Sequence, residues 1–236
     1  MKKLILGATG SIGSSLAKKI VADGGEVHLV GREETALSAL ASELNSTFTT
    51  CDVLEENFSE KIVNDLKDDP INGLAFCVGS IDLKPLKLTK KSDFMQSFNL
   101  NLISATEVIK SLADNLKKNK GSIVLFSTVA VKQGFPNHAI VSSAKGAIEG
   151  LTLALAAELA PNVRINCIAP SLTNSKISNF LLKNEKMAES IAKMHPLKRI
   201  GEGSDSASVA KFLLSDESSW ITGQILGIDG GRSSVA

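Results

Sequence analysis

The chain has 236 residues, a formal net charge of +1 and 43% hydrophobic residues. This length is enough for one large domain with a substantial core, and the balanced charge offers no basic surface to nucleic acid or an anionic membrane. No run approaches the roughly 18 apolar residues of a membrane-spanning helix, and the N-terminus lacks the apolar segment of a signal peptide. We therefore expect a cytoplasmic protein with neither nucleic-acid nor membrane partners.

Short apolar runs alternate with longer segments whose apolar residues are spaced three and four apart, as between Leu37 and Leu44. This alternation is typical of βαβ units and of a parallel sheet covered on both faces. The sequence therefore predicts an α/β fold, with one doubly wound Rossmann-type domain over residues 1–236 and a mostly parallel sheet of seven strands. The predicted strands are residues 4–6, 27–30, 47–50 (the weakest pattern), 74–78, 123–126, 163–168 and 225–228.

The predicted helix over residues 144–160 is apolar nearly all round, whereas a helix buried on one side has a broad polar face. We expect this helix to be buried on two sides, against the sheet and against another subunit. The sequence thus predicts a homo-oligomer.

The three cysteines, Cys51, Cys77 and Cys167, are scattered, and each lies in or beside a predicted strand. They have neither metal-ligand spacing nor the pattern of a disulfide framework. We expect three buried, reduced thiols and no metal site.

Glycines recur at a spacing of three between the first predicted strand and the following helix. Such glycines permit a tight turn and a close approach to a pyrophosphate, while the helix N-terminus supplies N–H donors and positive potential. An ordinary strand-to-helix turn is the alternative. The predicted dinucleotide-binding residues in this turn are Gly7, Thr9, Gly10, Ser11, Ile12 and Gly13.

The residue that follows the second strand bears on the choice of cofactor. An acidic residue there binds a ribose 2′-hydroxyl, but this chain has Arg32, which can pair with a 2′-phosphate. The sequence therefore favours NADP(H) over NAD(H), although Glu33 and Glu34 would oppose this if they pointed inward. The alternative is that Arg32 is a solvated residue at a helix start. Asp52-Val53, after the third strand, could accept a hydrogen bond from the adenine amino group.

Several motifs follow one another in an order that resembles the short-chain dehydrogenase/reductase family over essentially the whole chain. The resemblance implies hydride transfer between a nicotinamide and a carbonyl or alcohol carbon of a small-molecule substrate, in a tetramer or a dimer. It also implies that Gly79 and Pro170 contact the cofactor. The motifs are the glycine turn, residues 52–53, Asn101, residues 127–128, Lys145, residues 168–170, residues 196–201 and residues 221–231.

The family's working residues are Asn, Ser, Tyr and Lys, and Asn101 and Lys145 match the first and the last. The serine position, thirteen residues before the tyrosine position, is Thr128, which keeps a hydroxyl. The tyrosine position, four residues before the lysine, is Val141, and the chain contains no tyrosine at all. By the resemblance, Lys145 would keep its contact with the nicotinamide ribose but would lose the phenol whose pKa it lowers.

Three further positions depart from the family pattern. Ser11 stands where the glycine turn usually has glycine, residues 76–79 replace an Asn-Asn-Ala-Gly turn, and Ser171 replaces the glycine after Pro170. Several departures near one site suggest altered chemistry or a different reaction.

His138 is the predicted substitute for the missing proton donor. It lies seven residues before Lys145, the spacing at which the family's enoyl-acyl-carrier-protein reductases place their tyrosine, and histidine can donate a proton near neutral pH. The alternative is a polar residue in the loop before the helix. We expect His28, on a strand, to be structural, whereas His195 could face the substrate.

Residues 171–195 correspond to the family's substrate-covering flap. Its apolar residues could line a pocket or could simply pack the flap on the body; they are Leu172, Ile177, Phe180, Leu181, Leu182 and Met187.

Two functions remain open from the sequence. The first is an NADP(H)-dependent oxidoreductase of this type with altered or weak proton transfer. The second is a non-catalytic nucleotide-binding homologue that senses cofactor or pairs with an active relative.

Overall fold

The structure, a computed structural model, describes residues 1–67 and 69–235. Within these residues, seven strands form one sheet in the order β3-β2-β1-β4-β5-β6-β7, and every neighbouring pair is parallel. This confirms the predicted doubly wound α/β fold and makes the sheet fully parallel. The strands are β1 (Lys2–Leu6), β2 (Glu26–Gly31), β3 (Thr47–Thr50), β4 (Ile71–Phe76), β5 (Ser122–Phe126), β6 (Arg164–Pro170) and β7 (Ile225–Ile228).

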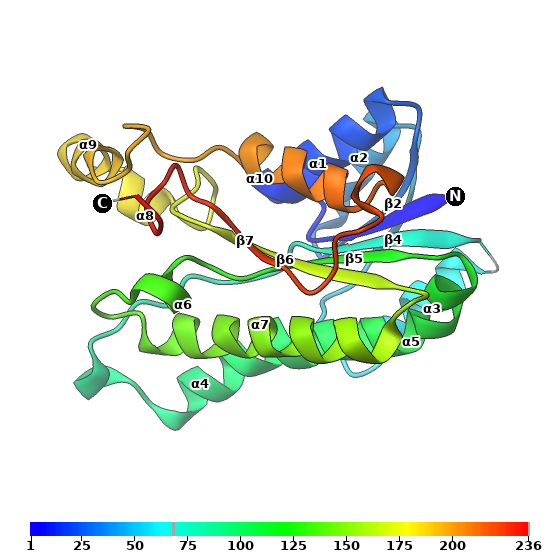
Figure 1. Ribbon diagram of the computed structural model, residues 1–236, viewed down its shortest axis with the longest axis horizontal. Coiled ribbons are helices and arrows are strands. Elements are labelled where there is room, and N and C mark those ends of the chain that lie inside the picture. The colour runs from blue at the N-terminus through cyan, green and yellow to red at the C-terminus, as the bar shows by residue number, and fades with distance from the viewer. Residues whose placement is uncertain (68, 236) are drawn as a thin grey trace.

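Helices cover both faces of the sheet (Figure 1). One layer holds α1 (Ser11–Ala22), α2 (Glu34–Glu43) and α10 (Gly203–Leu213). The other holds α3 (Phe58–Leu66), α4 (Lys91–Phe98), α5 (Ser104–Lys118) and α7 (Ala139–Leu159). The short elements are η1 (Leu86–Leu88), η2 (Asn99–Ile103), α6 (Ala130–Gln133), α8 (Asn179–Leu182), α9 (Glu185–Lys193) and η3 (Asp216–Ser218).

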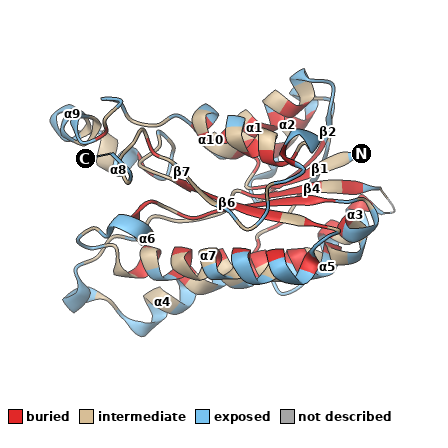
Figure 2. Cartoon of the chain, in the orientation of Figure 1, coloured by how far each residue is buried: buried red, intermediate tan, exposed pale blue. Residues whose placement is uncertain are grey.

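The buried hydrophobic residues form two clusters. In Figure 2, buried residues lie along the strands and on the helices of both layers. Successive residues of a strand point to opposite faces, so Leu4 and Leu6 join one cluster while Ile5 joins the other. This two-sided burial explains why the strands are continuous apolar runs rather than alternating ones.

The strand order reverses between β1 and β4. From β1 the chain builds outward to β3 and then returns to β4 on the other side of β1. In open α/β sheets, ligands bind beyond the carboxyl ends of the strands at such a switch point. The short helices α6, α8 and α9 lie at this end of the sheet (Figure 1).

Helix α7 begins at Ala139, earlier than the predicted start at residue 144. Its buried residues pack on β5 and β6, while Leu153 on its outer face is 54% exposed. Within the described residues it is the one helix long and apolar enough to cross a membrane. A single such helix is weak evidence for a span, because core helices of globular domains share this composition.

Candidate functional site

The turn that joins β1 to α1 contains two glycines at which a side chain would clash with the backbone. Gly7 has φ +71°, and a Cβ there would lie 2.8 Å from the carbonyl oxygen of Cys77. A Cβ at Gly13 would lie 2.3 Å from the carbonyl oxygen of Gly7. The two glycines therefore bring the N-terminus of α1 against the ends of β1 and β4. The first turn of α1 contains no acidic residue, so its N–H groups present uncompensated positive potential.

Arg32 is exposed at the end of β2 and lines the same cavity as the glycine turn. It forms no ion pair within the described residues, and of the two neighbouring glutamates only Glu33 lines the cavity. Asp52 also lines the cavity, and its Oδ1 accepts a hydrogen bond from the backbone N–H of Leu54 at 3.0 Å. These residues form one end of the cavity, as expected for the adenosine side of a dinucleotide site.

Gly79, Asn101 and Lys145 meet behind the turn that follows β4. A Cβ at Gly79 would lie 3.1 Å from Nζ of Lys145 and 3.2 Å from Oδ1 of Asn101. Asn101 lies in η2, a π-helical turn, and its Nδ2 donates to the carbonyl oxygen of Ser97 at 2.8 Å. Its Oδ1 is buried and has no hydrogen-bond partner in the described part of the chain. A buried orphan acceptor beside an ammonium is a group that calls for a functional explanation.

Lys145 is buried, 7% exposed, and the thiols of Cys77 and Cys167 lie near its ammonium. Burial lowers the pKa of Lys145 to about 8, against the opposing effect of Cys167 and Cys77. Burial likewise raises the pKa of each of these two cysteines to about 12, so both are neutral thiols. The ammonium is therefore a buried charge whose proton is held less firmly than that of an exposed lysine.

The two neighbouring hydroxyls at the end of β5 point to different partners. Ser127 donates to Oε1 of Glu149 at 2.6 Å, and so is committed to α7. Thr128 Oγ1 accepts a hydrogen bond from the backbone N–H of Ala130 at 3.3 Å and keeps its own proton available to the cavity. Val141 lines the cavity one helical turn before Lys145 and presents only methyl groups there.

His138 is the N-cap residue of α7 and lines the cavity. Its Nδ1 donates to the carbonyl oxygen of Pro136 at 2.7 Å, which leaves Nε2 as an acceptor in the neutral ring. The ring packs edge-on against Phe135, with 5.3 Å between centroids, and Arg232 lies 5.3 Å from the centre of the same Phe135 ring. Phe135 and Arg232 could not be predicted from the sequence, because their contact depends on the path of the C-terminal segment.

The flap contributes only part of its apolar residues to the cavity. Leu172, Ile177 and Leu181 line it, whereas Phe180, Leu182 and Met187 do not. Sequence reasoning missed Ile191 and Met194, which line the cavity near the end of α9. His195 lines it too, with Nε2 lying 2.8 Å from Oγ of Ser171.

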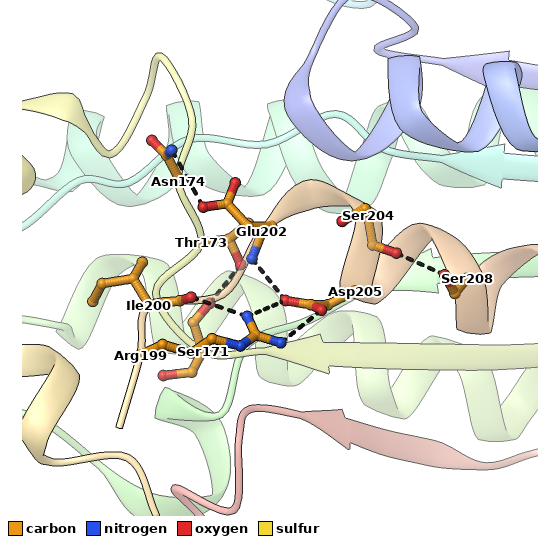
Figure 3. Close-up of polar contacts among 9 residues, drawn as sticks. All are labelled: Ser171, Thr173, Asn174, Arg199, Ile200, Glu202, Ser204, Asp205 and Ser208. Carbon is orange, nitrogen blue, oxygen red and sulfur yellow. Dashed lines mark hydrogen bonds and ion pairs between the residues drawn. The ribbon is translucent and has the colours of Figure 1, made fainter. Parts of the chain in front are cut away.

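The two ends of the flap are held together at its base (Figure 3). Thr173 and Gly201 form an isolated parallel bridge, and the backbone N–H of Gly201 donates to the carbonyl oxygen of Leu172 at 3.1 Å. Arg199 binds Asp205 through two hydrogen bonds of 2.6 and 2.8 Å, which anchor the segment to the start of α10. Both ends of the flap are therefore anchored to the body of the domain.

One cavity of about 650 Å³ connects these parts. Of the predicted site residues, Gly13 and Asn101 lie beneath its surface, and the others line it: Gly7, Thr9, Gly10, Ser11, Ile12, Arg32, Asp52, Val53, Gly79, Thr128, His138, Lys145 and Pro170. His28 lies elsewhere, buried and bonded to Thr47 and Thr49, as expected for a structural residue. No group of potential metal ligands was found in the described residues. The cavity contains the glycine turn, the N-terminus of α1 and Arg32, and its volume suits a dinucleotide and a small substrate.

The chain is similar throughout its length to known oxidoreductases. A family profile described as Enoyl-(Acyl carrier protein) reductase matches residues 7–233. A chloroplastic tropinone reductase homologue of Arabidopsis thaliana is 32% identical over 99% of this chain and 76% of that protein. L-xylulose reductase of Bos taurus is 30% identical over 98% of this chain and 95% of that protein.

Solved structures show the same similarity at the level of the fold. A short-chain dehydrogenase/reductase from Mycobacterium ulcerans superposes with a TM-score of 0.92 at 27% identity, covering 98% of this chain and 89% of that one. Fold, switch-point cavity and glycine turn define a nicotinamide-dinucleotide oxidoreductase class. Within that class, the chain belongs to the short-chain dehydrogenase/reductase family.

Proposed function

We propose that the protein is an NADP(H)-dependent oxidoreductase that interconverts a carbonyl and an alcohol in a small molecule. The observation that carries this proposal is the single cavity that joins the glycine turn and Arg32 at one end to Thr128 and Lys145 at the other. Hydride transfer requires that the cofactor and the substrate be held side by side, next to groups that polarise the substrate and carry protons. A single cavity with nucleotide-binding residues at one end and polar side chains at the other meets this requirement.

The residues present fit a dinucleotide. Gly7 and Gly13 leave the space that a Cβ would fill, and the N-terminus of α1 offers N–H donors to a pyrophosphate. Val53 and Asp52 would flank the adenine, while Gly79, Pro170 and Lys145 would contact the nicotinamide nucleoside. When bound, the cofactor supplies the hydride or accepts it.

Arg32 supports the preference for NADP(H). Its guanidinium is exposed on the cavity wall, and within the described residues no carboxylate pairs with it. A guanidinium binds phosphate through two parallel hydrogen bonds, which a ribose hydroxyl cannot match.

The chain's own residues would polarise the substrate and handle the proton. Thr128 can donate its hydroxyl proton in a hydrogen bond to a carbonyl oxygen. Lys145 would place positive charge beside it, with Asn101 supporting the ammonium from behind Gly79. His138, with a free Nε2 on the cavity wall, is a candidate for proton transfer. Val141 cannot take part in that step.

Two further properties belong to the proposal. We infer a homo-oligomer, a tetramer or a dimer, from the apolar outer face of α7. The three free cysteines, none of them exposed, fit a reducing compartment such as the cytoplasm.

The proposal is tested by binding and by transfer, measured separately. Calorimetric titration should show NADPH binding, and NADPH deuterated at C4 should yield deuterated alcohol from a ketone panel that includes tropinone and L-xylulose. Absence of NADPH binding contradicts the proposal. Binding without any deuterium transfer would favour the alternative of a non-catalytic nucleotide-binding homologue, which the apolar Val141 supports.

A further inference from the structure

Ser171 and His195 form a hydrogen-bonded pair, although 24 positions separate them in the chain. His195 is 2% exposed, and its Nδ1 lies 2.8 Å from the carbonyl oxygen of Ile191. A carbonyl oxygen only accepts, so Nδ1 carries the proton of the neutral ring and Nε2 is left as an acceptor. The hydroxyl of Ser171 therefore donates to Nε2 across 2.8 Å. A hydroxyl that is hydrogen-bonded to a histidine is well placed for proton transfer when a further group, here the carbonyl oxygen of Ile191, holds the imidazole in position.

The pair lies near Thr128, the hydroxyl that is proposed to polarise a substrate oxygen. The backbone N–H of Val129 donates to the carbonyl oxygen of Pro170 at 3.1 Å, so the ends of β5 and β6 lie side by side. Thr128 and Ser171 are thus presented from neighbouring strands about 5 Å apart. Both line the cavity that Lys145 also lines.

Several contacts hold the pair in place. The contacts at the base of the flap hold the backbone beside Ser171. Thr173, which forms the bridge with Gly201, also donates from Oγ1 to the carbonyl oxygen of Ser171 at 3.0 Å (Figure 3). On the other side, Gly230 has φ +61°, and its added Cβ would lie 3.6 Å from Cβ of His195. The imidazole is therefore confined between the body and the flap, with little side-chain freedom to lose on reaction.

We propose that Ser171 and His195 are the proton relay of this enzyme and replace the acid/base that Val141 cannot supply. This inference rests on the proposed oxidoreductase function. In alcohol oxidation, the substrate hydroxyl passes its proton to Oγ of Ser171, and the Ser171 proton passes to Nε2 of His195, which becomes an imidazolium. The substrate C–H bond breaks with its electron pair going to the oxidised nicotinamide, and the carbonyl forms. Carbonyl reduction runs these transfers in reverse.

Activity of Ser171→Ala and His195→Gln gives the first test. Both should bind NADPH as the unmodified protein does and should lose about 10²-fold or more in kcat on any panel substrate. His28→Gln, which removes a buried histidine outside the cavity, should keep kcat and is the matched control. His138→Gln is measured in parallel. Unchanged kcat in both relay variants, or loss in His138→Gln alone, overturns the proposal.

A second measurement needs no substrate. With ¹⁵N-labelled histidine, the imidazole signals of His195 should report protonated Nδ1 and bare Nε2, and should shift on NADPH binding and in Ser171→Ala. A protonated Nε2, or a ring that ignores both cofactor and Ser171, contradicts the relay even if no panel substrate reacts. Failure of NADPH to bind at all would instead count against the proposed function.

Discussion

Arg32 is the side chain on which the proposed cofactor choice depends. We expect the protein to bind NADPH more tightly than NADH, and Arg32→Ala to lose about tenfold of the NADPH affinity with little change for NADH. Charge-assisted hydrogen bonds contribute about 1.5–3 kcal/mol each, and exposure of Arg32 places the effect at the low end.

Calorimetric titration of both cofactors measures this, with Lys132→Ala as a control that removes an exposed cation outside the cavity. Equal affinity of the unmodified protein for the two cofactors, or a preference for NADH, would remove Arg32 from its proposed role.

Val141 lies one helical turn before Lys145 on the face of α7 that lines the cavity. We expect the unmodified protein to reduce carbonyls through the proposed Ser171–His195 relay, and we expect a further increase in Val141→Tyr, because a phenol there would lie beside the ammonium that lowers its pKa. Turnover of the carbonyl panel with NADPH measures both proteins.

Val141→Phe is the matched control, since it adds the ring without the hydroxyl. A gain in the phenylalanine variant equal to that of the tyrosine variant would assign the effect to packing. Turnover in Val141→Tyr no faster than in the unmodified protein would show that the phenol adds nothing to the proton donor already present.

The outer face of α7 is the surface to which we assign self-association. Gly150 and Ala154 are exposed there beside Leu153, which is 54% exposed, and Met95 on α4 and Ile103 add further exposed apolar area. We expect an oligomer at micromolar concentration, and Leu153→Asp should shift it to smaller species because a charge would be buried in the contact.

Sedimentation velocity measures this. Phe48→Asp, on the edge strand β3, places the same charge on an exposed apolar residue of another surface and should leave the assembly intact. A monomer in the unmodified protein, or dissociation by both variants alike, contradicts the assignment.

Element types could be predicted from the sequence, but several boundaries could not, and two of these have a visible cause. Asn72 and Gly73 look like turn residues, yet they lie inside β4, where Lys3 Nζ donates to Oδ1 of Asn72 and Gly73 pairs with β1. Helix α7 likewise begins at Ala139, where packing on the body extends the helix past the local pattern. Both differences are tertiary effects, which overrule local preference.

For the molecule as a whole, the structure places most residues of the predicted motifs around one cavity. The glycine turn, Arg32 and Lys145 can be recognised in the sequence because of their local context. The first two follow predicted strands, and Lys145 lies on a predicted helix, four residues after the family's tyrosine position. The Ser171–His195 contact is different, since it depends on how the flap returns to the body. Nothing in the local spacing of these two residues predicts a distance between them.

Stability at mildly acidic pH should depend on His28, which is 1% exposed on β2. Thr49 Oγ1 donates to Asp65 at 2.6 Å and so accepts from Nε2 of His28, which makes Nδ1 the acceptor in the neutral ring. Burial, reinforced by nearby Lys2 and opposed by Asp65 and Asp69, lowers the pKa of His28 to about 4 from its usual 6.5.

A histidine with a depressed folded-state pKa stabilises the fold fully above the unfolded pKa, and this contribution is lost as pH falls from 6.5 toward 4. The expected loss is roughly 3 kcal/mol in the free energy of unfolding. Carboxylates whose pKa is lowered, such as Asp205, act only below their ordinary value of 3.8, so the two effects occupy separate pH windows. Urea unfolding between pH 7 and 4.5 measures the loss, and His28→Gln should flatten it because the amide does not titrate. Parallel losses in the two proteins would show that another group controls acid stability.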